Sequence, residues 1–181
     1  MKKELFLSFN PKYFKPLLYG LKKYEYRKRF CNEATTAYLY LSQKMKKVIG
    51  IVELGKPLRL EEVIKELDKD SEVFKRVDEY LKKGNKNAVP IKSLRLFKKS
   101  ISLDEIRKEI PNFMPPQMYY VLDNNKKLKN LMHKQELDEV LFVHDHDTIY
   151  LDNLALSCRE IEKTEEYKAI DIEFDYDKKI I

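Results

Sequence analysis

The segment from Gly20 to Arg29, Gly-Leu-Lys-Lys-Tyr-Glu-Tyr-Arg-Lys-Arg, constrains the fold of this chain more than any other stretch. Its glycine follows apolar residues at helical spacing, a position typical of a left-handed helix end. From Lys23 onward, tyrosines alternate with charged side chains, which is the period of a β-strand. We therefore expect a short helix that ends at Gly20 and leads at once into a strand.

The remainder of the first 122 residues has the pattern of short strands and helices separated by turns. An apolar run at residues 5–9 predicts a strand, and Asn10-Pro11 after it predicts a helix start. Further strands are expected at 35–41, 47–54 and 88–97, and helices at 60–67, 73–84 and 102–110. Gly50 inside a strand predicts a bulge or a close backbone approach. Ser102 and Glu105 form a capping-box pattern.

Asp123-Asn124-Asn125 has the composition of a boundary between residues 1–122 and an acidic extension, residues 123–181. The extension is predicted to be β-rich. We expect a helix at 126–133, a hairpin of strands 139–143 and 148–152, and further strands at 155–161 and 169–176. Because these segments contain apolar runs, we expect the extension to pack on the first domain and leave the 20–29 face open.

Charge is distributed unevenly along the chain. Residues 1–59 hold 14 Lys and Arg against 4 Asp and Glu, whereas residues 136–181 hold 5 against 14. A basic front is typical of a surface that meets a polyanion, and an acidic tail is typical of a protein-partner surface. A lysine-rich solvated surface would give the same composition, so charge alone leaves both interpretations open.

The expected cellular compartment and the expected absence of a cofactor are inferred from motifs that the sequence does not contain. Cys31 and Cys158 stand alone in sequence, which is typical of reduced thiols inside the cell. No apolar stretch approaches the length of a membrane span, and the N-terminal apolar run is too short for a signal peptide. With only 4 glycines there is no glycine-rich phosphate loop. We expect a cytoplasmic protein without membrane contact and without a cofactor.

Five stretches together resemble the ASCH family of the PUA-like superfamily. They are residues 7–13, 20–29, 38–40, 48–53 and the Pro-Pro-Gln turn at 115–120. The resemblance covers roughly residues 4–122. It implies an α+β fold, a small PUA-like β-barrel with flanking helices, and a function in binding RNA or a modified nucleotide.

A basic rim is expected around the 20–29 segment. Its candidate nucleic-acid-binding residues are Lys12, Lys15, Lys22, Lys23, Arg27, Lys28, Arg29 and Gln117. Tyr24 and Tyr26 could stack on bases, but filling the barrel core is the interpretation we favour for them.

An enzyme is the alternative to a binding module. Some ASCH proteins resemble amidohydrolases of acetylated cytidine, with a lysine after the glycine turn, a threonine on the next strand and a glutamate on a later one. Those positions fall on Lys22, Glu25 and Glu53, so a glutamate stands where the threonine would be. Other ASCH proteins resemble ribonucleases. The carboxylates could equally be structural ion pairs between strands. A regulatory adaptor that uses the acidic tail is the third hypothesis.

Two further residue groups carry weaker signals. His144 and His146 with two aspartates could ligate a metal, but a polar hairpin tip has the same composition and no third ligand is apparent, so no metal is predicted. Cys31 lacks a neighbouring histidine and is not expected to be a nucleophile.

Overall fold

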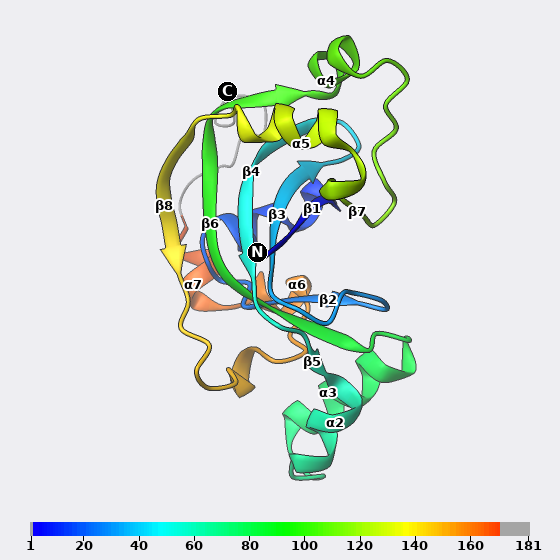
Figure 1. Ribbon diagram of the computed structural model, residues 1–181. Coiled ribbons are helices and arrows are strands. Elements are labelled where there is room, and N and C mark those ends of the chain that lie inside the picture. Colours follow the sequence, from blue (N-terminus) through cyan, green and yellow to red (C-terminus); the bar gives the residue numbers. More distant parts are fainter. Residues whose placement is uncertain (1, 171–181) are drawn as a thin grey trace.

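Figure 1 shows the computed structural model, which describes residues 2–170. A mixed sheet curls into a half-barrel flanked by helices, so the expected α+β class with a barrel-like sheet is confirmed. The strands are β1 (Lys3–Phe9), β2 (Tyr24–Arg27), β3 (Thr35–Leu41), β4 (Lys47–Leu54), β5 (Leu58–Arg59), β6 (Asn87–Ser102), β7 (Tyr119–Val121) and β8 (Leu137–Val143). The α-helices are α1 (Phe14–Leu18), α2 (Leu60–Val63), α3 (Glu72–Lys82), α4 (Leu103–Glu109), α5 (Lys126–His133), α6 (Cys158–Ile161) and α7 (Glu165–Lys168). Short 3₁₀ turns are η1 (Pro11–Tyr13), η2 (Ile64–Glu66), η3 (Leu122–Asn124) and η4 (Leu151–Asn153).

One long strand organises the sheet. The hydrogen-bonded order is β2-β6-β4-β3-β1-β7, and β5 and β8 also pair with β6. The 16 residues of β6 pair with β2 and β5 near the start of the strand, and with β4 and β8 further along. Because β6 pairs with different strands along its length, the sheet curls around this strand (Figure 1). Only β1 and β3 are parallel among these pairs.

The predicted close approach at Gly50 is confirmed. The register between β4 and β6 shifts between Val48 and Gly50, which marks an irregularity in the ladder. A Cβ atom on Gly50 would lie 2.2 Å from the carbonyl oxygen of Arg95. Glycine is required here because only a residue without a side chain lets the two strands come this close.

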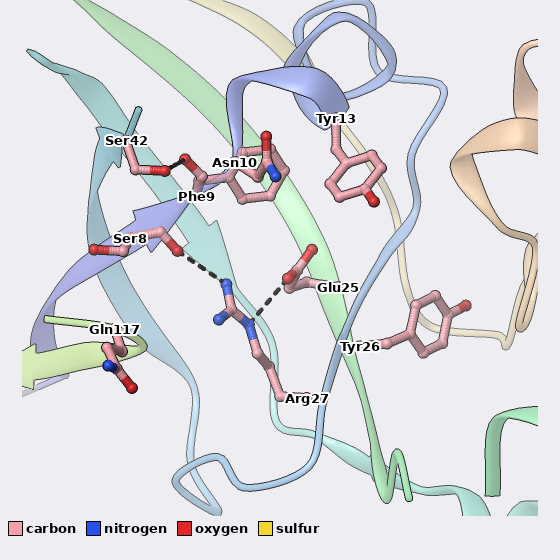
Figure 2. Close-up of a pocket in the computed structure, with 9 residues that line it drawn as sticks. All are labelled: Ser8, Phe9, Asn10, Tyr13, Glu25, Tyr26, Arg27, Ser42 and Gln117. Carbon is pink, nitrogen blue, oxygen red and sulfur yellow. Dashed lines mark hydrogen bonds and ion pairs between the residues drawn. The ribbon is translucent and has the colours of Figure 1, made fainter. Parts of the chain in front are cut away.

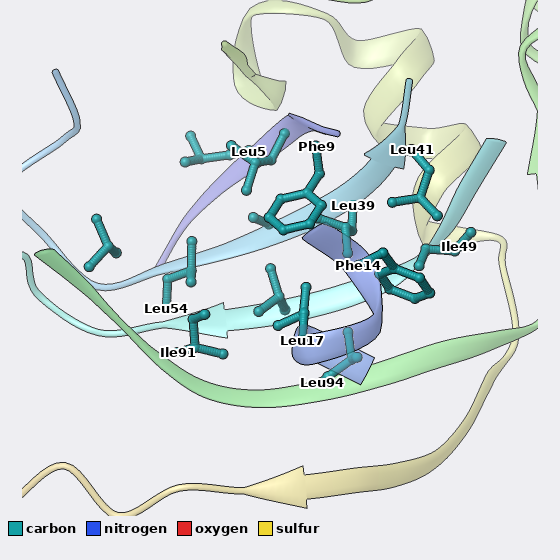
Figure 3. Close-up of a cluster of buried hydrophobic side chains, with 14 of the residues drawn as sticks. Leu5, Phe9, Phe14, Leu17, Leu39, Leu41, Ile49, Leu54, Ile91 and Leu94 are labelled. Carbon is teal, nitrogen blue, oxygen red and sulfur yellow. The ribbon is translucent and has the colours of Figure 1, made fainter. Parts of the chain in front are cut away.

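The main core lies between one face of the sheet and α1 (Figure 3). Alternate residues of β1, Leu5, Leu7 and Phe9, point into this core because side chains of a strand alternate between its faces. Phe14 and Leu17 of α1 pack against them and are almost fully buried. Burying such side chains stabilises a fold by about 1.5–3 kcal/mol each. This packing fixes α1, and with it the turn that precedes β2.

Two smaller clusters extend the core. On the other face of the sheet, Phe6 and Tyr40 pack with Ile106 of α4 and Leu128 of α5. Near the start of β6, Tyr24 of β2 packs with residues of α2 and α3 and with Leu154 and Ala155 of the extension. The extension therefore packs on β2.

The helix after Asn10 is shorter than the sequence suggested. Residues 11–13 form a 3₁₀ turn, with the Asn10 side chain accepting a hydrogen bond from the Lys12 amide, and the α-helix spans only Phe14–Leu18. Gly20 follows it with φ of +68°, as expected for a left-handed end. The capping box of Ser102 and Glu105 is also confirmed.

The predicted hairpin in the extension is wrong. β8 pairs with β6, and the segment 148–152 contains no strand. The segment 155–161 contains α6, so the predicted third strand is wrong as well. Tertiary contacts override the local pattern here, because the edge of β6 offers β8 a partner. Residues 169–170 are not in a strand, and the rest of the predicted strand 169–176 lies outside the described residues.

Within residues 2–170, no helix combines the length and apolarity that a bilayer crossing requires.

Candidate functional site

A cavity of about 280 Å³ opens where β1 ends and β2 passes beside it (Figure 2). Strand β1, η1, the residue after β3 and the Pro-Pro-Gln turn all contribute to its wall. It is lined by Ser8, Phe9, Asn10, Tyr13, Glu25, Tyr26, Arg27, Ser42 and Gln117. We call this the first cavity. The segment from Gly20 to Arg29 thus supplies three of its residues.

Glu25 is the charged centre of this region. Its Oε2 lies 3.1 Å from Nζ of Lys22, and its Oε1 lies 2.9 Å from Nε of Arg27. Nη2 of Arg27 also donates to the carbonyl oxygen of Ser8 at 3.2 Å, which fixes the guanidinium at the cavity wall (Figure 2). All three side chains are only 10–14% exposed. Two cations share one carboxylate, so one positive charge remains uncompensated within this trio.

Lys22 does not line the first cavity. It lines a second cavity of about 450 Å³, which shares Tyr13, Glu25 and Tyr26 with the first. Nζ of Lys22 is also 4.0 Å from Sγ of Cys158 in α6. Burial raises the pKa of that thiol, which keeps it in the neutral form.

Glu53 does not join Lys22 and Glu25. On β4, Val52 and Leu54 face the main core, so Glu53 points to the opposite face of the sheet. There its carboxylate accepts a hydrogen bond from Thr36 at 2.8 Å and pairs with Lys2 at 2.7 Å. It lines neither the first nor the second cavity. Of the three candidate catalytic residues, only Lys22 and Glu25 are brought together.

The two tyrosines of β2 form hydrogen bonds that stabilise the fold. Tyr24 is 1% exposed, and its hydroxyl accepts a hydrogen bond from the amide of Tyr150 at 2.9 Å. The Tyr26 hydroxyl accepts one from the amide of Ala155 at 2.6 Å. Burial raises the pKa of both phenols. Tyr24 is therefore a core residue, while Tyr26 is part structural and part cavity wall.

The residues of the basic rim lie in four different environments. Arg27 and Gln117 line the first cavity, and Lys22 lines the second. Lys12, Lys28 and Arg29 are exposed outside both cavities.

The other two rim lysines pack on aromatic rings of the extension. Lys15 lies 4.8 Å from the ring centre of Tyr167, and Lys23 lies 5.5 Å from that of Tyr150. Lys23 also donates to the carbonyl oxygen of Gly20 at 3.0 Å, and burial lowers its pKa. Both side chains are engaged within the protein.

His144 is buried, contrary to the expectation of a polar hairpin tip. Its Nδ1 lies 2.8 Å from the carbonyl oxygen of Ile91, and its Nε2 lies 2.9 Å from that of Gly20. Burial lowers the pKa of His144 and of His146. In the part of the chain that the structure describes, no group of three metal-ligating side chains occurs. His144 instead holds the turn that precedes Lys22.

Several cavity residues had no role in the sequence analysis. Tyr13, Ser42, Asn85 and Arg159 line the cavities, but the sequence patterns around them indicated only secondary structure, which for Arg159 was a strand that the structure does not contain. Gln117 of the Pro-Pro-Gln turn was a candidate residue in the sequence, and it does line the first cavity.

The comparisons with known proteins agree with the geometry. No protein-family model matches the sequence, and no curated protein matches it either. Solved structures do match. ASCH from Zymomonas mobilis superposes with a TM-score of 0.52 at 22% identity, covering 74% of this chain and 96% of that one. A serine-to-alanine variant of that protein superposes with a TM-score of 0.55 at 22% sequence identity, and the match covers 75% of this chain and 98% of the variant. A tyrosine-to-phenylalanine variant superposes with a TM-score of 0.53 at 21% sequence identity, and the match covers 75% of this chain and 100% of the variant. The chain therefore has the fold of an ASCH domain, as the five short stretches of sequence predicted.

Proposed function

We propose that this chain, with its ASCH-domain fold, binds single-stranded RNA and holds one nucleotide in the first cavity. The observation that carries the proposal is the trio of Lys22, Glu25 and Arg27, whose uncompensated positive charge borders a cavity with aromatic walls. A cation beside aromatic rings suits a nucleotide, because the phosphate requires a positive charge and the base requires a stacking surface.

The walls of the first cavity suit the two parts of a nucleotide. Tyr13 is 38% exposed, so its ring is accessible to a base. The side chain of Gln117 is exposed and has no hydrogen-bond partner within residues 2–170. Its amide can donate to and accept from a base edge. The guanidinium group of Arg27 is a hydrogen-bond donor suited to a phosphate oxygen.

The test is RNA binding measured by fluorescence anisotropy with a labelled single-stranded dodecamer at increasing salt concentration. We expect the affinity to fall as salt rises, because phosphate contacts release counterions. Arg27→Ala should weaken binding about tenfold and reduce the salt slope by about one. The matched control is Arg95→Ala, because Arg95 donates to the carbonyl oxygen of Asp138 on β8 and lines neither cavity.

Absent binding, or binding that salt does not weaken, would contradict the proposal. Equal losses in Arg27→Ala and Arg95→Ala would place the RNA elsewhere on the surface.

Hydrolysis is the second candidate function. The 3.1 Å contact between Lys22 and Glu25 favours it, because a lysine and a carboxylate in contact beside a cavity are able to exchange a proton with a substrate. The test incubates the protein with the dodecamer and with acetylated cytidine, and follows product formation. Turnover of saturating substrate that Lys22→Gln abolishes would establish it. Without product from either substrate, the protein is a binding module.

A further inference from the structure

The second cavity adjoins the first. The two share Tyr13, Glu25 and Tyr26, so a ligand that fills one lies against a wall of the other. The remaining lining residues are Lys22, Tyr80, Asn85, Ser157, Cys158 and Arg159. We infer that the second cavity is a subsite for the adjacent nucleotide of the same RNA strand, an inference that rests on the proposed function.

Two polar side chains of this cavity are available to a ligand. Within residues 2–170, neither the guanidinium of Arg159 nor the side-chain amide of Asn85 forms a hydrogen bond or an ion pair. A guanidinium binds phosphate through two parallel hydrogen bonds, and an amide reads a base edge through its donor and acceptor. Arg159 thus supplies the phosphate contact and Asn85 the base contact.

The cavity also offers aromatic surface. Tyr80 lies edge-on to Tyr26 with ring centres 4.5 Å apart, and Tyr13 is the partly exposed ring that both cavities share. Successive bases of a single strand stack on such rings without a strong sequence preference. Lys22, held by Glu25, places a cation in the wall of the second cavity, beside the residues that both cavities share, where it can meet a phosphate of the strand.

The acidic extension provides one wall of this subsite and is held there before any ligand arrives. Its amide at Ala155 donates to Tyr26, and its carbonyl oxygen at Leu154 accepts from Nε of Arg76 in α3 at 3.1 Å. A wall fixed in advance lowers the ordering cost of binding. The subsite therefore gives the extension a part in recognition, with Arg159 as its contact residue.

The experiment uses the full chain and measures displacement of the labelled dodecamer by unlabelled oligouridylates of increasing length. For the unmodified protein, we expect the dinucleotide to compete at least about fivefold better than the mononucleotide, because it fills both cavities. Arg159→Ala should remove that gain and leave mononucleotide competition unchanged. Asn85→Ala should reduce the gain. Lys163→Ala is the matched control, since Lys163 is exposed two residues beyond α6 and lines neither cavity.

The outcomes separate this inference from the function on which it rests. If mononucleotide and dinucleotide compete equally well, the second subsite is refuted while RNA binding stands. If Arg159→Ala and Lys163→Ala lower competition by the same factor, the effect is general charge and the subsite is again refuted. If the dodecamer itself fails to bind, the proposed function is refuted, and the subsite with it.

Discussion

The hydroxyl of Tyr26 accepts a hydrogen bond from the amide of Ala155 at 2.6 Å, which joins β2 to a residue 129 positions later in the chain. The same ring borders both cavities. One side chain thus links the candidate RNA site to the acidic extension, and the extension is fixed in place by contacts with β2.

Removing that hydroxyl tests the link. Tyr26→Phe should lower the free energy of unfolding by about 1–2 kcal/mol, because the amide of Ala155 loses its buried partner. Urea denaturation followed by circular dichroism measures the change. Tyr13→Phe is the control, because the Tyr13 hydroxyl has no hydrogen-bond partner within residues 2–170. Equal stability of the two variants would argue that the contact does not hold the extension.

Glu25→Gln should separate stability from binding. The substitution keeps the shape of the side chain but leaves Lys22 and Arg27 as two uncompensated, largely buried cations. We expect a loss of about 2 kcal/mol in unfolding free energy. RNA affinity at low salt should rise and its salt dependence should steepen, because the site gains one net positive charge. A variant with unchanged salt dependence would mean that RNA does not meet this trio.

The close contact at Gly50 predicts a steric effect. Gly50→Ala would place a Cβ atom 2.2 Å from the carbonyl oxygen of Arg95 and 2.7 Å from Cα of Leu96, so β4 and β6 must move apart. We expect a loss of about 3 kcal/mol by thermal or urea denaturation. Gly55→Ala is the matched control, because there the added atom meets side chains of Pro90 and Lys92 at 3.0 Å or more. If both variants lost the same stability, the strand approach at Gly50 would not be the cause.

His144 predicts a pH dependence of stability. Burial lowers the pKa of His144 in the folded protein, so the unfolded chain binds a proton that the folded one resists. The folded state therefore loses stability as pH falls below the unfolded pKa of about 6.5. His146 contributes in the same direction, and Lys23 adds repulsion against the protonated ring.

Urea midpoints measured from about pH 7.5 down to about pH 5.5 check this, because carboxylates titrate mostly below that window. The fall in stability should be smaller in His144→Gln, which retains only the contribution of His146. A variant whose midpoint falls as steeply as that of the unmodified protein would rule out His144 as the group responsible.

The local features were within reach of the sequence. The left-handed turn at Gly20, the capping box of Ser102 and Glu105, and the bounds of α5 at residues 126–133 all match their predictions. Each of these depends on interactions within a few residues, so the amino acids themselves carry the signal. The ASCH-like fold was also recognisable, since five short stretches occur in the right order.

The candidate site was decided by tertiary structure. Sequence placed Lys22, Glu25 and Glu53 in one group, but the side-chain alternation of β4 turns Glu53 to the other face of the sheet. The choice of β6 as the partner of β8 ruled out the expected hairpin and left residues 150–155 to pack on β2. Which face a carboxylate occupies and which edge a strand joins depend on residues far apart in the chain. Only the folded molecule therefore determines that Arg159 of the acidic extension shares a cavity with Lys22 of the basic front.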